Sequence, residues 1–214
     1  MDHNWIDLTH LISSTTLVYP GDPFLEITNR ADFPRDGFHM DVIKSAMHVG
    51  THLDSPYHFV ETGFGVEEIP LKNVIGYANV IEVKVINGVI KTDDIVEGYS
   101  KVDNPYPILL INAGHGVLFN QEEYFKNCPS FEPSFFEFVM NHQIHTIGLD
   151  LPTIQYHGES PKQAHLDFLG QEITIIEGLN HLDELHSEVF FAGLPLKIKG
   201  LDGSMIRAVA KNLN

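Results

Sequence analysis

The 214-residue chain has very little cysteine and little positive charge. Cys128 is its single cysteine, which excludes an intrachain disulfide and a metal site built from several thiolates. Lysine and arginine together number 13 against 29 aspartates and glutamates, and the formal net charge is -16. Because binding to nucleic acid or to anionic membranes needs a basic surface, we expect neither class of partner.

Long apolar runs are missing as well. No run approaches the length of a membrane span. Residues 1–10 lack the basic and then apolar pattern of a secretory signal, so a cytoplasmic protein is expected. The length fits one domain with its own core, and no linker, repeat or low-complexity stretch interrupts it. We therefore predict a single domain over residues 1–214.

Short strand patterns outnumber helical patterns along the chain. Strands are predicted at residues 78–86, 107–113, 144–150, 173–177 and 189–198. Helices are predicted at residues 92–99, with Thr92 as N-cap, at 133–142, and at 161–169, with Pro161 in the first turn. Because the two kinds do not alternate regularly, we expect a mixed, largely β architecture with peripheral helices rather than a doubly wound sheet.

The densest group of potential metal ligands lies in residues 48–58, which read His-Val-Gly-Thr-His-Leu-Asp-Ser-Pro-Tyr-His. A helix is disfavoured there by the glycine and the proline. A straight strand would hold the backbones of His48 and His52 roughly 13 Å apart, too far for both to bind one ion. The chain must therefore bend, and Gly50 is the natural hinge. Pro56 would then stiffen the turn that brings His58 back.

Imidazole and carboxylate groups suit a borderline divalent ion such as zinc or manganese. The alternative is a surface loop that contains several histidines by chance, in a chain that has 13 of them. The interleaved glycine, threonine and proline favour the metal site, because a constrained loop needs such residues. Neither a Gly-x-Ser-x-Gly elbow nor a P-loop is present, which disfavours a serine hydrolase or a nucleotide-binding protein.

The segment also matches, at every fixed position, the pattern H-x-G-[TA]-H-x-D-x-P-x-H. Further motifs follow along the chain: Tyr-Pro-Gly-Asp at 19–22, Gly-Leu-Asp-Leu-Pro at 148–152, His165, Glu-Gly-Leu at 177–179, Leu-Pro-Leu-Lys at 194–197, Asp-Gly-Ser at 202–204 and Arg207. In these motifs the chain resembles the cyclase family of metal-dependent hydrolases, which includes bacterial kynurenine formamidases and isatin hydrolases.

The resemblance implies a site for two divalent ions per chain, zinc or manganese. His48, His52 and Asp54 would hold the first ion, and Asp54 would bridge to the second. His165 would bind the second ion, and Glu177 would contact both. Taken alone, His165 is typical of a helix surface. Glu177 ends an apolar run, where a carboxylate is costly to bury unless it is paired or metal-bound.

The resemblance further implies an α/β fold of the swivelling β/β/α type, with a β-rich, barrel-like core, assembled as a homodimer. The implied reaction is the hydrolysis of N-formyl-L-kynurenine to L-kynurenine and formate by metal-activated water, with His58 as acid and base. Tyr19 would line the substrate pocket, where formamidases often have tryptophan. Residues 153–157 also depart from the formamidase pattern. Another aryl or cyclic amide, such as an isatin-like lactam, and a non-catalytic metal-binding module remain as alternatives.

Overall fold

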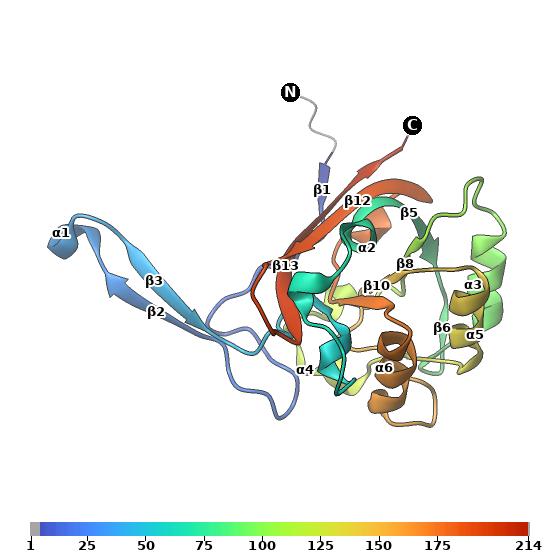
Figure 1. Cartoon of the computed structure of the whole chain (residues 1–214), viewed down its shortest axis with the longest axis horizontal. Helices are drawn as coiled ribbons and strands as arrows, with labels where there is room; N and C mark the ends of the chain where they lie inside the picture. Colours follow the sequence, from blue (N-terminus) through green and yellow to red (C-terminus); the bar gives the residue numbers. More distant parts are fainter. Residues whose placement is uncertain (1–4, 214) are drawn as a thin grey trace.

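The computed structural model describes residues 5–213, which fold around one closed β-sheet (Figure 1). The sheet has the strand order β1-β13-β12-β5-β8-β10-β11-β4, and an additional pairing of β4 with β13 closes all of it except β1 into a barrel. Its strands are β1 (Trp5–Asp7), β4 (His52–Asp54), β5 (Ile75–Glu82), β8 (Ile108–Asn112), β10 (Thr146–Leu149), β11 (Thr174–Glu177), β12 (Glu188–Pro195) and β13 (Gly203–Asn212). The predicted α/β fold with a barrel-like mixed sheet is confirmed.

The barrel has a parallel half and an antiparallel half. Strands β5, β8, β10 and β11 are mutually parallel, whereas β12, β13, β4 and β1 pair antiparallel. The crossovers of the parallel half carry α3 (Thr92–Tyr99), α4 (Glu122–Lys126), α5 (Ser134–Asn141) and α6 (Pro161–Gly170). Parallel neighbours need such crossovers. In this half, strands and helices therefore alternate more regularly than we expected from the sequence.

The predicted elements are present, with some shifted ends. The predicted strand 78–86 is divided into β5 and β6 (Val85–Ile86). Helix α3 begins at Thr92, but the predicted cap is wrong, because Lys91 occupies the N-cap position. The Thr92 N–H instead donates to Glu132 Oε2 at 2.9 Å. The remaining elements are α2 (Leu71–Val74), β7 (Val89–Ile90), β9 (Ser130–Phe131) and 3₁₀ turns at Pro56–His58, Val66–Glu68, Gly116–Leu118 and Leu182–Glu184.

Apolar side chains pack on both faces of the parallel strands. One cluster lies between the sheet and the helices and includes Phe131, Phe135 and Phe168. The other lies on the opposite face and includes Leu53 and Phe191. Burial of this apolar surface fixes the strand ends, where the candidate ligands lie. No helix in residues 5–213 is long and apolar enough to cross a bilayer.

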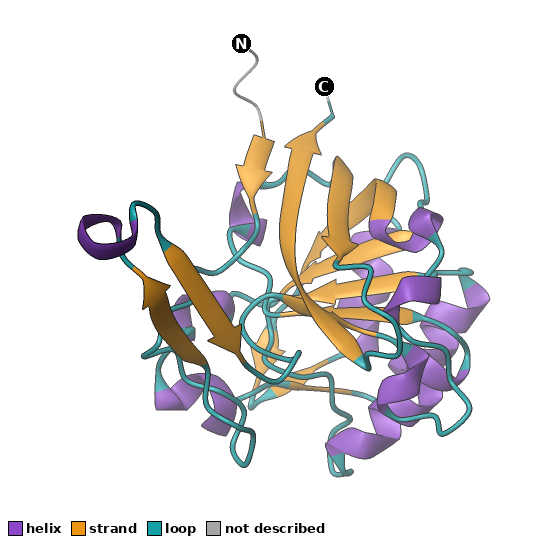
Figure 2. Ribbon diagram, turned by 60° about the vertical axis from the view of Figure 1, so that its left-hand side comes forward, coloured by secondary structure: helices purple, strands orange, loops and turns teal. Residues whose placement is uncertain are grey.

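A two-stranded arm projects from the barrel (Figures 1 and 2). It consists of β2 (Glu26–Ala31), the short helix α1 (Phe33–Asp36) and β3 (Met40–Lys44), with β2 and β3 antiparallel. Every residue of β3 is exposed, although three of the five are apolar. The chain leaves the barrel for the arm and rejoins it beside the candidate metal centre.

Candidate metal centre

The histidine segment bends at Gly50, as the spacing of its candidate ligands predicts. Gly50 has φ +64°, and a Cβ atom there would lie 2.7 Å from a methyl carbon of Ile12. Gly178 also has a positive φ, and its position allows no Cβ because the Gly50 carbonyl lies against it. The Thr51 hydroxyl donates to the Gly178 carbonyl and accepts the His10 N–H at 2.9 Å. The bend is thus held against the end of β11.

Strand pairing sets His52 opposite Glu177. The two residues are register partners between β4 and β11, and His52 Nε2 lies 3.4 Å from Glu177 Oε2. His52 Nδ1 lies 2.9 Å from the Gly50 carbonyl. With its proton on Nδ1, His52 donates to this carbonyl, which fixes the ring. The lone pair of Nε2 then points toward the carboxylates.

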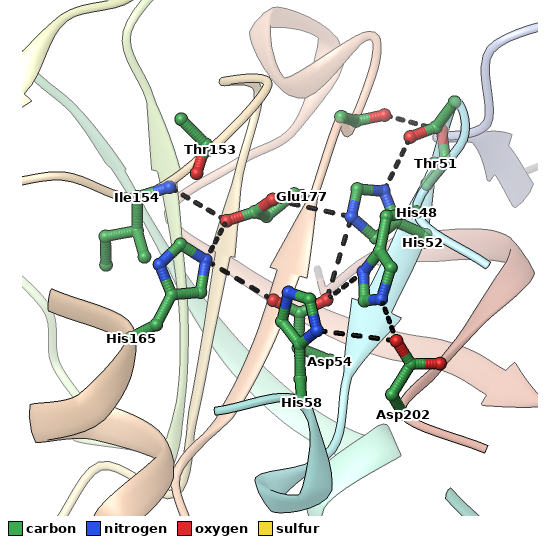
Figure 3. A network of polar contacts seen from close by, with 12 residues as sticks. His48, Thr51, His52, Asp54, His58, Thr153, Ile154, His165, Glu177 and Asp202 are labelled. Carbon is green, nitrogen blue, oxygen red and sulfur yellow. Dashed lines mark hydrogen bonds and ion pairs between the residues drawn. The ribbon is translucent and has the colours of Figure 1, made fainter. Parts of the chain in front are cut away.

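Asp54, His165 and Glu177 form a buried group that could hold a metal ion (Figure 3). His165 Nε2, on α6, lies 3.5 Å from Asp54 Oδ2 and 3.5 Å from Glu177 Oε1. The Ile154 N–H donates to Glu177 Oε1 at 2.8 Å. Asp54 Oδ2 is buried and has no hydrogen-bond partner in the described structure. Such an oxygen is costly to bury alone, so the group fits a divalent cation.

A second group, less buried, consists of His48, Asp54 and His58. His48 Nδ1 lies 2.8 Å from Asp54 Oδ1, and His48 Nε2 lies 2.9 Å from Asp202 Oδ2. The same Asp202 oxygen lies 3.4 Å from His58 Nδ1, and the rings of His48 and His58 stack with centroids 4.0 Å apart. Asp54 therefore belongs to both groups and lies between them.

These charges shift the protonation of the second group. Burial by itself would lower the pKa of His48, but the charge of Asp54 and the hydrogen bonds to Asp202 and Asp54 raise it to about 10. Burial would raise the pKa of Asp54, but His48 and its neighbours hold it well below its usual range. Hydrogen bonds from His48 and His58 lower the pKa of Asp202 as well. A metal ion bound by His48 would have to displace its proton.

The predicted residues meet at one cavity. A space of about 350 Å³ is lined by Tyr19, Asp22, Ala46, His48, His52, His58, Phe59, Pro152, Thr153, His165, Glu177 and Asp202. Asp54 lies beneath this lining, 1% exposed. A cavity of about 430 Å³ between β5 and α3 is larger, but no histidine lines it. The candidate site is therefore identified by the chemistry of the side chains that line the cavity and not by the volume of the cavity.

Asp202, Asp22 and Phe59 also line the cavity, and no role was expected for them from the sequence. Phe59 stacks on His165 with ring centroids 4.6 Å apart and lies edge-on to His58 at 4.4 Å, so it fixes both rings. Asp202 precedes β13, whose Gly203 is paired with Asp54. A Cβ at Gly203 would lie 2.6 Å from His48. The signal in the sequence is the Asp-Gly pair itself, an acid followed by a residue without a side chain.

Comparisons with known proteins agree with this geometry. Residues 6–156 match the family described as putative cyclase. The chain is 26% identical to a kynurenine formamidase of Bacillus cereus over 97% of both chains, and 28% identical to that of Geobacillus thermodenitrificans over the whole of both. It is 34% identical to an uncharacterized protein of Methanocaldococcus jannaschii over 96% of this chain and 97% of that protein.

Solved structures show the same fold. An isatin hydrolase A from Labrenzia aggregata superposes with a TM-score of 0.84 at 20% identity, over 98% of this chain and 94% of that one. A predicted metal-dependent hydrolase from Bacillus stearothermophilus superposes with a TM-score of 0.77 at 24% identity, over 96% and 97%. With most of its length matched by the family and its fold shared throughout, the chain belongs to the putative cyclase family.

Proposed function

We propose that this protein is a metal-dependent arylformamidase, which hydrolyses N-formyl-L-kynurenine to L-kynurenine and formate. The observation that carries the proposal is that two groups of ligating atoms share the buried carboxylate of Asp54 beside one cavity. Full-length similarity to kynurenine formamidases supports the amide as the bond that is cleaved.

The proposed cofactor is a pair of divalent ions, zinc or alternatively manganese. His48, His52 and Asp54 would hold one ion, and Asp54, His165 and Glu177 the other. Nitrogen and oxygen ligands of this kind suit zinc. His52 Nε2 lies 3.7 Å from Asp54 Oδ1 and 3.4 Å from Glu177 Oε2, between the two groups. His58, by contrast, lies in the same group as His48 and Asp54. His58 is therefore the residue whose role most needs a test.

The chain's own residues would position the substrate and move the proton. Bound divalent ions would supply Lewis acidity and lower the pKa of water toward neutrality. His58 Nδ1 faces Asp202 Oδ2 at 3.4 Å, which would leave His58 Nε2 to take a proton from water and return it to the departing aryl nitrogen. Phe59 holds the ring of His58 edge-on, and Tyr19 lines the wall of the cavity.

The test compares two amides on protein loaded with zinc or with manganese. Release of kynurenine from N-formyl-L-kynurenine is followed by absorbance, and the opening of isatin is followed in parallel. We expect the formamide to be hydrolysed with the higher kcat/KM. Faster opening of isatin would make the protein a lactam hydrolase. Failure of both substrates on fully loaded protein would contradict catalysis and leave a metal-binding module.

We also propose that the protein forms a homodimer. An isolated two-stranded hairpin is marginally stable in water, yet the arm exposes Phe33 by 63%, Ile43 by 56% and Met40 by 50%. A second copy would cover this apolar surface. Light scattering on the intact protein and on an Ile43→Lys variant tests this: the variant should be monomeric, and a monomeric wild type would contradict it.

The cytoplasmic location and the 1–214 domain, whose ends lie outside the described residues, stay predictions.

A further inference from the structure

The turn Tyr19-Pro20-Gly21-Asp22 forms one wall of the cavity and has no part in either group of metal ligands. The Asp22 N–H donates to the Tyr19 carbonyl at 3.0 Å, and Gly21 between them has φ +104°. Proline followed by a glycine of positive φ is the pattern of a type II turn. The turn fixes the backbone of Asp22 beside Tyr19, so both side chains line the cavity.

The carboxylate of Asp22 has neither a hydrogen bond nor an ion pair with any side chain or backbone group of residues 5–213. Its charge nevertheless reaches the cavity: burial raises the pKa of Tyr19, and the charges of Cys128, Glu177 and Asp22 raise it further. Tyr19 thus lies within the field of both Glu177 at the metal groups and Asp22 on the wall.

The lining of the cavity contains three carboxylates, those of Asp22, Glu177 and Asp202, and no lysine or arginine. Asp202 is engaged by His48 and His58, and Glu177 by His52 and His165. Asp22 alone remains available to a ligand. A substrate carboxylate would find no lysine or arginine on these walls, whereas a substrate ammonium group would find Asp22.

We propose that Asp22 is a specificity-determining residue, which binds the protonated amine of an aryl formamide while the formyl group is held at the metal ligands. The inference rests on the proposed arylformamidase activity. The site then selects substrates by their ammonium group and does not recognise their carboxylate. The substrate class is aryl formamides that carry a primary amine, with or without a neighbouring acid.

Four formamides with the same aryl ketone separate the two charges. N-formylkynurenine carries the amine and the acid, N-formylkynuramine carries only the amine, 2-formamidoacetophenone carries neither, and 3-(2-formamidobenzoyl)propanoic acid carries only the acid. On the zinc-loaded enzyme, kcat/KM should be highest for the two amines, lower for the neutral compound and lowest for the acid. The difference between amine and neutral compound should be about tenfold to a hundredfold, as for a charge-assisted hydrogen bond.

Asp22→Asn keeps the size of the side chain and removes the charge. It should raise KM for the two amines by about tenfold, leave their kcat within about twofold, and leave the neutral formamide unchanged. Asp22→Lys should reverse the order, so that the acid becomes better than the amine. Asp93→Asn, on exposed α3 and outside the cavity, changes the net charge equally and should change none of these values.

Binding provides a readout that does not depend on turnover. Titration calorimetry should show kynuramine binding to the wild type at least about tenfold more tightly than 2-aminoacetophenone, and Asp22→Asn should abolish this difference. If no formamide is hydrolysed but the binding difference is present, the proposed activity fails and the amine site stands. If the neutral formamide is hydrolysed as well as the amines, and Asp22→Asn changes neither KM nor binding, the inference is overturned.

Discussion

The two groups of candidate ligands around Asp54 differ in burial and in what holds them. In the inner group, the side chains of His165 and Glu177 are 5% and 4% exposed, and they come from helix α6 and strand β11. In the outer group, His58 is 25% exposed, and Asp202, which contacts it, is 41% exposed. Both of these outer residues lie in short connecting segments beside strands.

Because of this difference, the two groups have different roles in the site. The inner group is held by strand pairing and by a backbone N–H, and burial strengthens its attraction for a cation. The outer group is held by shared protons between histidines and carboxylates, and it faces the solvent that must receive and return a proton. We infer that the inner group only binds metal, whereas the outer group combines the proposed metal ligands His48 and Asp54 with His58, which moves protons.

The largest expected effect comes from the residue that both groups share. Asp54→Asn should lower kcat/KM by at least about a thousandfold, because it removes a charged ligand from both ions. Bound zinc, measured by elemental analysis, should fall with activity. Zinc should also cease to raise Tm, since this rise depends on binding to the folded state. A variant that kept the metal and the rate of the wild type would contradict the shared role of Asp54.

A substitution of His58 distinguishes a proton carrier from a metal ligand. If it moves protons, His58→Asn should lower kcat by roughly a hundredfold to ten-thousandfold with normal zinc content. The loss should be smaller for a formanilide with a better leaving group, which needs less protonation. His165→Asn is the matched variant in the inner group and should lose metal. Loss of zinc from His58→Asn in proportion to activity would show that His58 is a ligand.

Asp202 should have a smaller effect, because it acts through His58 and His48. Asp202→Asn keeps a hydrogen-bond acceptor but removes the charge, and we expect kcat to fall by about tenfold with KM and zinc content close to normal. The pH dependence of kcat should change, which a purely structural role would not cause. Unchanged kcat across the pH range would remove Asp202 from the account of the outer group.

The smallest expected effect concerns the stability of the metal-free protein at high pH. The pKa of His48 is raised from 6.5 to about 10, so protonated His48 stabilises the fold below pH 6.5, and this contribution is lost as pH rises to about 10. Between pH 7 and 10.5, Tm of the metal-free wild type should fall by roughly 5 °C more than Tm of His48→Gln. Parallel curves for the two proteins would contradict the raised pKa.

Local patterns predicted the parallel half of the fold better than the antiparallel half. Runs such as residues 107–113 and 173–177 are rich in branched apolar residues, and they became β8 and β11. Strand β13 was not predicted, although it is ten residues long, because alanine, serine and glycine fill many of its positions. The arm was not predicted either. Its strands bury almost no side chain, so they lack the alternation that marks a strand packed on a core.

The same limit applies to the site. Spacing within 48–58 was enough to place His48, His52 and Asp54 together, because a single bend at Gly50 brings them close. His165 and Glu177 were located only through the resemblance, since nothing local links an α6 residue to that bend. For Asp202 the Asp-Gly pair is the one local signal, and its place beside His48 depends on the antiparallel pairing of β13 with β4.

The most direct test of the account is a metal titration of the activity. Protein freed of metal by chelation is mixed with increasing zinc, and hydrolysis of N-formyl-L-kynurenine is measured at each point. We expect no turnover without metal and a rise to a plateau at about two zinc ions per chain. Turnover that does not depend on metal, or none at any zinc content, would contradict a metal-dependent arylformamidase.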